Sequence, residues 1–122
     1  VRSRGLGDVY KRQVYILRLT NKSYYTGFTA DLRRRLALHA SGRASRLTRS
    51  FRPVCLAQCW RIACSRGEAL RVEAFIKSRD RRRKEGLVRN PVLLADWLRR
   101  EAGLALRPSP LDRRTRMLLQ SF

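Results

Sequence analysis

Two short β-rich segments on either side of a polar turn place the strongest constraint on how this chain can fold. Residues 14–20 (VYILRLT) combine β-branched and aromatic side chains, and residues 24–28 (YYTGF) do the same after the polar residues 21–23. Such a pair typically forms an antiparallel hairpin, because a short turn reverses the chain between two strands. The sequence therefore predicts a β-hairpin over residues 14–28.

An amphipathic helix is predicted directly after the hairpin. Thr29 can cap its N-terminus, and Asp31 lies in its first turn, where the helix dipole favours a negative charge. Gly42 ends the helix, since glycine readily adopts the left-handed conformation that follows many helices. Four residues share one face of this helix at positions i, i+3, i+4 and i+7: Leu32, Arg35, Leu36 and His39. This face therefore combines an arginine and a histidine with apolar side chains.

A third strand and a second helix are predicted in the middle of the chain. The basic segment 43–52 (RASRLTRSFR) is expected to be a loop, and the apolar segment 53–62 that follows it is expected to be a strand. Ser65 and Glu68 have the S-x-x-E spacing of a capping box, in which each side chain satisfies a backbone N–H of the other residue. A helix is therefore expected to begin at this point.

A further helix is predicted toward the C-terminal end. Asn90 is expected to cap it before Pro91, and Gly103 is expected to end it. The order of elements is then β-β-α-β-α-α. This order predicts an α+β fold, with a small, mainly antiparallel three-stranded sheet flanked by helices and a C-terminal helical extension.

The length of 122 residues suits one folded domain, because two separate cores would each be too small to bury enough apolar surface. We expect residues 14–90 to form this domain and residues 91–122 to form the helical extension. Residues 1–13 lack a sustained apolar period and are expected to be a flexible leader; they also look like translated adaptor sequence, which would make them non-native. No apolar run approaches the roughly 18 residues that a membrane-spanning helix needs.

The strong positive charge of the chain points to a polyanionic partner. It has 29 Lys and Arg residues against 9 Asp and Glu residues, a net charge of +20. Nucleic acid is the usual partner for such a balance, and an anionic membrane surface is the second choice. Most of the basic residues are arginines, which suits two-point binding of phosphate, but a GC-rich coding genome would enrich arginine as well.

Several kinds of chemistry are not indicated by the sequence. The three cysteines, Cys55, Cys59 and Cys64, form no C-x-x-C pair, and the single histidine, His39, is distant from them, so a zinc site is not predicted. Buried thiols in a reducing, cytoplasmic environment are expected instead. The sequence also has no glycine-rich phosphate loop within a strand–loop–helix unit and no nucleophile elbow.

Five short motifs follow one another in the first two thirds of the chain. They are Gln13-Val14-Tyr15, Tyr25-Thr26-Gly27, Arg35 with His39 four residues later, the basic segment 47–53 (LTRSFRP), and residues 68–77, which have the form E-A-L-x-x-E-x-x-I-K. In this order they resemble a GIY-YIG nuclease domain over residues 14–88, in the compact form of small bacterial proteins and structure-specific endonuclease subunits. Gln13 and Thr26 depart from the glycine and isoleucine of the family's two tyrosine motifs.

The resemblance implies a role for each residue of a nuclease site. Tyr15 would accept a proton from the attacking water, with help from Tyr25 and His39, while Arg35 would clamp the scissile phosphate. Glu73 would be the single carboxylate that binds Mg²⁺ or Mn²⁺. A tyrosine is a weak base at neutral pH, so Tyr15 would need nearby positive charge or a metal to lower its pKa.

Each of these residues also has a purely structural interpretation. Tyr15 and Tyr25 could simply pack in the hairpin, Arg35 could lie on the surface, and His39 could be a buried, hydrogen-bonded histidine. Glu73 could pair with Lys77 at i+4 on an exposed helical face.

The basic residues in and beyond the predicted loop are expected to contact backbone phosphates without reading bases. The candidates are Arg43, Arg46, Arg49, Arg52, Lys77 and Arg82. The function implied is a divalent-metal-dependent endonuclease acting on DNA, with a preference for branched or junction-containing substrates and a place in DNA repair; RNA stays open as a substrate. The alternative is a non-catalytic nucleic-acid-binding module that keeps the nuclease fold.

Overall fold

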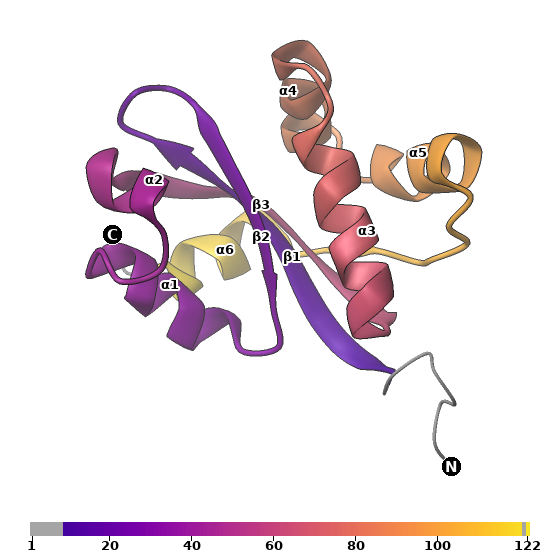
Figure 1. Ribbon diagram of the computed structural model, residues 1–122, viewed down its shortest axis with the longest axis horizontal. Helices are drawn as coiled ribbons and strands as arrows, with labels where there is room; N and C mark the ends of the chain where they lie inside the picture. Colours follow the sequence, from indigo (N-terminus) through magenta and orange to yellow (C-terminus); the bar gives the residue numbers. More distant parts are fainter. Residues whose placement is uncertain (1–8, 121) are drawn as a thin grey trace.

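The computed structural model describes residues 9–120 and 122, and it has an α+β architecture (Figure 1). The predicted fold class is confirmed. The elements follow in the order β1 (Tyr10–Leu19), β2 (Tyr24–Thr29), α1 (Leu32–Ala40), α2 (Arg46–Ser50), β3 (Pro53–Cys64), α3 (Arg66–Lys77), α4 (Arg81–Arg89), α5 (Leu93–Ala102), β4 (Ser109–Pro110) and α6 (Arg113–Leu119).

One antiparallel sheet runs through the molecule in the strand order β2-β1-β3-β4. It has four strands where three were predicted, because the two-residue strand β4 pairs with Trp60 and Arg61 of β3. Strand β1 lies between β2 and β3, so Tyr15 stands opposite Gly27 on one side and Cys59 on the other. Strand β2 is an edge strand, which leaves its outer side open for a site.

Strand β1 begins at Tyr10, four residues before the predicted start of the hairpin. Residues 10–13 continue the ladder with β3, where Tyr10 stands opposite Cys64 and Gln13 opposite Arg61. The prediction was wrong here because this pairing joins segments far apart in the sequence, which local composition cannot show. Residues 1–8, the rest of the predicted leader, lie outside the described residues.

The two faces of the sheet carry two separate cores. In Figure 1, helices α3, α4 and α5 lie on one side of the sheet, and α1, α2 and α6 lie on the other. Strand alternation sends Val14 and Ile16 into the first core, together with Trp60, and it sends Tyr15 and Leu17 into the second. The second core therefore places the buried ring of Tyr15 beneath α1.

Three local predictions differ from the structure. Asp31, rather than Thr29, caps α1 by accepting a hydrogen bond from the backbone N–H of Arg34, because Thr29 is still paired in β2. The segment predicted as a basic loop contains the short helix α2, which Ser45 caps through the backbone N–H of Thr48. Asn90 ends α4 instead of opening α5.

The C-terminal elements pack on the sheet. Leu94 and Leu98 of α5 are buried in the first core, and the indole N–H of Trp60 donates to the carbonyl of Pro91 at 2.8 Å. On the other side, the Gln120 amide oxygen accepts from the backbone N–H of Leu56 at the outer edge of β3. The described residues between 91 and 122 therefore share their cores with the rest of the fold.

Candidate active site

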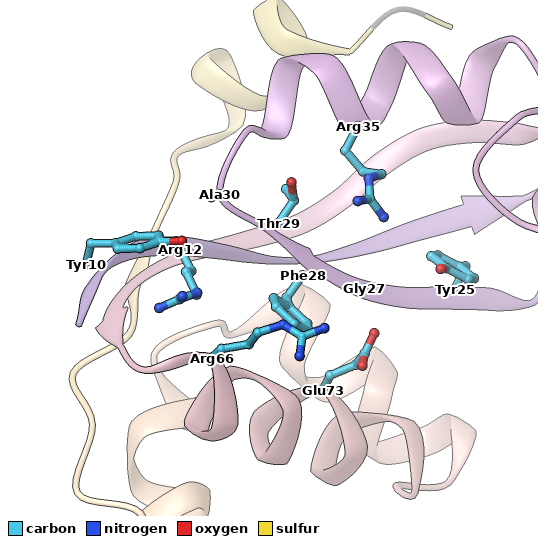
Figure 2. Close-up of a pocket in the computed structure, with 10 residues that line it drawn as sticks. All are labelled: Tyr10, Arg12, Tyr25, Gly27, Phe28, Thr29, Ala30, Arg35, Arg66 and Glu73. Carbon is cyan, nitrogen blue, oxygen red and sulfur yellow. The ribbon is translucent and has the colours of Figure 1, made fainter. Parts of the chain in front are cut away.

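A pocket of about 360 Å³ lies at the β2 edge of the sheet, between α1 and α3 (Figure 2). The hairpin, the first helix and the capping-box helix all contribute to it. Its lining residues are Tyr10, Arg12, Tyr25, Gly27, Phe28, Thr29, Ala30, Arg35, Arg66 and Glu73. Three of the predicted site residues, Tyr25, Arg35 and Glu73, thus meet in one pocket.

Arg35 and Glu73 reach the pocket from opposite helices. In Figure 2 the Arg35 guanidinium extends from α1 and the Glu73 carboxylate extends from α3, and both point toward strand β2. The N-terminal caps of the two helices, Asp31 for α1 and Ser65 for α3, fix where each helix begins and therefore which face it turns to the strand. A cation and an anion placed in this way can bind an anionic group and a metal ion side by side.

Glu73 is the one carboxylate in the pocket lining. Its side chain is 18% exposed, and its carboxylate lies 3.6 Å from the ammonium of Lys77, the i+4 pair that the sequence suggested. No group of three or more potential metal ligands occurs in the part of the chain that the structure describes. A single hard oxygen donor fits Mg²⁺ or Mn²⁺ if water and substrate oxygens complete the coordination shell.

Tyr15 does not line the pocket but lies directly behind it. Its side chain is fully buried, and a Cβ placed on Gly27 would come within 2.6 Å of the Tyr15 hydroxyl oxygen. Only glycine can therefore occupy this pocket position while the tyrosine ring packs beneath it. The thin backbone wall at Gly27 separates the Tyr15 hydroxyl from the pocket.

His39 is hydrogen-bonded through both ring nitrogens. Its Nε2 lies 2.7 Å from the Tyr15 hydroxyl and its Nδ1 lies 2.9 Å from the Thr48 hydroxyl. Burial lowers the pKa of His39 to about 4, and the nearby Arg35 acts in the same direction. The imidazole is therefore neutral at pH 7 and has one lone pair available to accept a proton.

The two tyrosines of the site have raised pKa values. Burial raises the pKa of Tyr15 well above its usual value, with Tyr25 and Glu73 acting in the same direction and Arg35 opposing them. Burial also raises the pKa of Tyr25, with Glu73 adding to the effect and Arg35 and the Ser45 hydroxyl opposing it. The positive charge that we expected to lower the pKa of Tyr15 is thus present in Arg35, but burial outweighs it.

Tyr25 lies between the buried pair and the pocket. Its ring is 4.9 Å from the His39 ring, in an edge-to-face arrangement, and 6.3 Å from the Tyr15 ring. The Lys77 ammonium lies 5.9 Å from the centre of the Tyr25 ring. Tyr25 is therefore the tyrosine that faces the pocket and the cations around it.

The remaining predicted phosphate-binding residues lie outside the pocket lining. Arg43, Arg46 and Arg49 are exposed around α2, and Arg82 is exposed on α4. Arg52 instead donates to the carbonyl of Ala40 at 2.8 Å. Arg46 and Arg49 thus lie on α2, whose Thr48 contacts His39, and Arg43 lies just before this helix.

Two features of the site were not singled out from the sequence. Arg66, the first residue of α3, lines the pocket opposite β2, and only its place at the helix start could have indicated it. Thr48 is fully buried against His39, although it lies in a segment rich in arginine. The spacing of Thr48 from His39 carries no helical or strand periodicity that would predict this contact.

The α+β domain thus places a hairpin tyrosine, Arg35 and His39 of α1 and the Glu73 carboxylate of α3 in or beside one pocket, an arrangement that a comparison with family models assigns to a nuclease fold. The family model described as the GIY-YIG catalytic domain matches residues 11–86. The chain belongs to the GIY-YIG family, and the family assignment made from the sequence is confirmed.

Relatives of similar size share this part of the chain. A UPF0213 protein of Streptococcus pneumoniae serotype 4 is 42% identical over 76 residues, which is 62% of this chain and 76% of that protein. The UPF0213 protein BH0048 of Halalkalibacterium halodurans is 44% identical over 75 residues, which is 62% of this chain and 79% of that protein.

A solution NMR structure of the UPF0213 protein BH0048 from Bacillus halodurans also matches. It is 38% identical, it covers 73% of this chain and 97% of that chain, and its TM-score is 0.39. In the described part of this chain, no helix has the length and apolar character needed to span a membrane.

Proposed function

We propose that this protein is a divalent-metal-dependent endonuclease that hydrolyses DNA phosphodiester bonds and selects its substrate by shape. The observation that carries this proposal is the convergence of Arg35 and Glu73 on one pocket beside the Tyr15–His39 hydrogen bond. Phosphodiester hydrolysis needs a phosphate clamp, a means of offsetting developing negative charge and an acceptor for the proton of water. The pocket and its buried neighbours offer a candidate for each.

Glu73 would hold the metal ion, with waters and phosphate oxygens as the other ligands. When bound, a divalent ion supplies charge stabilisation at the phosphoryl and leaving oxygens. Because a single carboxylate makes a weak site, we expect firm metal binding only when nucleic acid is present.

Arg35 would bind the scissile phosphate, because its planar guanidinium can donate two parallel hydrogen bonds to phosphate oxygens. It reaches the pocket from the opposite helix to Glu73, so a phosphate between them would contact both the Arg35 guanidinium and a metal ion held by Glu73. Neighbouring Arg33 and Arg34 are exposed on the outer surface of α1 and serve as internal controls for this role.

Tyr15 would accept the proton of the attacking water and pass its own proton to His39. The raised pKa keeps Tyr15 protonated at neutral pH, so it can accept a proton only if its hydroxyl proton moves to His39 Nε2 at the same time. The water oxygen then forms the new bond to phosphorus, the electron pair of the broken bond goes to the leaving oxygen, which takes up a proton from solvent, and His39 ends as the imidazolium. The Tyr15 hydroxyl is fully buried and lies one backbone layer behind the pocket, so this step requires that the attacking water reach the hydroxyl past Gly27 when substrate is bound.

The exposed arginines around α2 would follow the DNA backbone. Arg43, Arg46 and Arg49 carry charge without a base-reading element beside them, and phosphate contacts alone carry no sequence information. Selection by the shape of the DNA follows as the expected form of specificity. A branch or a junction would present the scissile strand to the pocket while its duplex arms lie on the basic surface, which Arg43, Arg46 and Arg49 form around α2.

The test is cleavage of labelled branched, flapped and plain duplex DNA with Mg²⁺ or Mn²⁺. Glu73→Gln and Tyr15→Phe should each abolish cleavage while DNA binding, measured by fluorescence anisotropy, persists. Glu85→Gln, which removes the same charge from α4, is the matched control and should cleave normally.

Other outcomes have definite meanings. Tight, salt-dependent binding without cleavage by either metal would replace the proposal with a non-catalytic binding module. Cleavage that survives Tyr15→Phe but not Tyr25→Phe would move the proton-accepting role to the tyrosine that lines the pocket.

A further inference from the structure

A chain of buried hydrogen bonds runs from β1 through α1 to the start of α2. The Tyr15 hydroxyl contacts His39 Nε2 at 2.7 Å, His39 Nδ1 contacts the Thr48 hydroxyl at 2.9 Å, and the Thr48 hydroxyl contacts the Ser45 hydroxyl at 2.8 Å. Tyr15, His39 and Thr48 are all fully buried. Solvent is therefore excluded from the Tyr15–His39 and His39–Thr48 contacts, while the Thr48–Ser45 contact is partly buried.

The direction of each hydrogen bond follows from what the groups can donate and accept. Tyr25, Glu73 and Arg35 act on Tyr15 through their charges, and Arg35 can only donate. Among the described residues, His39 Nε2 is the acceptor within hydrogen-bond distance of the Tyr15 hydroxyl, so the hydroxyl proton goes to Nε2. The neutral imidazole then carries its own proton on Nδ1, and Thr48 must accept it. The Thr48 hydroxyl donates in turn to Ser45, whose hydroxyl and carbonyl oxygens lie 2.8 Å and 3.4 Å away.

The opposite arrangement would leave a buried group without a partner. If the Thr48 hydroxyl donated to His39 Nδ1, the imidazole proton would sit on Nε2 and point at the Tyr15 oxygen. The Tyr15 hydroxyl proton would then have no acceptor in the buried chain, which carries a substantial free-energy penalty. The geometry therefore selects one tautomer of His39, and Thr48 is the residue that selects it.

We propose that Thr48 is a positioning residue that fixes His39 in the Nδ1–H tautomer and so keeps Nε2 free to accept the Tyr15 proton. This inference rests on the proposed function for its catalytic consequence, although the tautomer itself does not depend on activity. His39 Nε2 can accept the Tyr15 proton only while the Nδ1–H group of His39 donates to the Thr48 hydroxyl.

The surroundings of His39 make Thr48 the decisive contact. The other groups that face the imidazole are Tyr15 from β1, Tyr25 from β2 and Arg35 from its own helix. Tyr25 meets the ring edge to face, and Arg35 acts on it through its charge. Neither offers an acceptor to Nδ1, which the Thr48 hydroxyl contacts.

Helix α2 carries both Thr48, which selects the His39 tautomer, and two of the exposed arginines that would bind DNA. Thr48 lies in α2, which Ser45 caps, and Arg46 and Arg49 are exposed on the outer side of that helix. A DNA backbone that contacts these arginines would hold α2, and with it the Thr48 hydroxyl, against His39. Substrate binding and proton acceptance would in this way share one short helix.

The test is the protonation pattern of His39, read from the two imidazole ¹⁵N shifts in long-range ¹H–¹⁵N NMR spectra of the full chain. We expect the Nδ1–H tautomer in the native protein and in Thr48→Ser, which keeps the hydroxyl. Thr48→Val keeps the shape but loses the acceptor, so its spectrum should show the Nε2–H tautomer or a mixture. Thr26→Val, which removes a buried threonine hydroxyl from the opposite face of β2, should leave the tautomer unchanged.

Cleavage assays then test the consequence for the reaction. We expect Thr48→Val to lower kcat roughly 10-fold or more with DNA affinity unchanged, and Thr48→Ser to restore it. An Nε2–H tautomer in the native protein would overturn the inference even if Thr48→Val failed to fold, and so would an unchanged tautomer in folded Thr48→Val. A native protein that cleaves no DNA would refute the proposed function, while the NMR result would still decide the role of Thr48 in selecting the tautomer.

Discussion

Gly27 stands directly opposite Tyr15 in the β1–β2 ladder, and a Cβ on Gly27 would lie 2.6 Å from the Tyr15 hydroxyl oxygen and 2.8 Å from the ring carbon that carries it. The glycine therefore does two things at once. It leaves room for a buried tyrosine in the second core, and it brings the hydroxyl of that tyrosine to within one backbone layer of the pocket.

This relationship predicts that Gly27→Ala destabilises the protein and disrupts the site. The Tyr15 ring is fully buried and cannot move aside freely, so overpacking should lower the unfolding free energy by about 1–3 kcal/mol. Urea denaturation measures the loss. Gly86→Ala is the control, because its Cβ would meet only the Trp97 ring at 3.9 Å, and alanine inside α4 should raise stability by about 0.5–1 kcal/mol. Equal effects of the two substitutions would contradict the close contact with Tyr15.

The depressed pKa of His39 predicts that stability depends on pH in a defined window. Folding lowers this pKa from 6.5 to about 4, so between these values the unfolded chain binds a proton that the folded protein does not. The contribution of His39 to the unfolding free energy should therefore be fully present above pH 6.5 and should fall by about 3 kcal/mol as the pH drops to 4. His39 is the only histidine in the chain, so His39→Gln should flatten the upper part of this window in urea titrations. If the unfolding free energy of the variant still falls with pH as in the native protein, groups other than His39 cause the dependence.

The planar geometry of Arg35 predicts that lysine cannot replace it. Arg35→Lys keeps the positive charge in the pocket but loses two-point hydrogen bonding to phosphate, so single-turnover cleavage should slow about 100-fold. Arg34→Lys changes the exposed neighbouring residue in the same way and should cleave at the normal rate. If both variants behave alike, the contribution of Arg35 is general charge rather than phosphate clamping.

The sequence contained most of what is needed to place the pocket. Local patterns indicated the hairpin, the capping box of α3 and the helical pair Arg35 and His39, because each depends on residues close together in the chain. The convergence of hairpin, α1 and α3 followed from these elements and the family resemblance. The structure brings these elements together at the pocket, while the roles of the individual residues stay predictions.

The features that the sequence did not show depend on distant contacts. The first residues of β1 are held by pairing with β3, and helix α2 exists within a segment whose many arginines suggest a loop. The burial of Tyr15 depends on Gly27 and on α1 above it, so its raised pKa could not be anticipated from the hairpin alone. Thr48 became visible as a partner of His39 only once α2 was placed.

The basic surface around α2 predicts a specific loss of salt dependence. Each lysine or arginine that neutralises a DNA phosphate releases counterions and adds about 0.9 to the slope of log K against log salt concentration. Arg46→Ala with Arg49→Ala should therefore reduce this slope by about 2, measured by fluorescence anisotropy over a salt series. The control is Arg99→Ala with Arg100→Ala on α5, where both arginines pair with Asp96. This pair removes the same total charge at a different place in the fold, so an equal reduction would mean that binding follows net charge rather than the α2 surface.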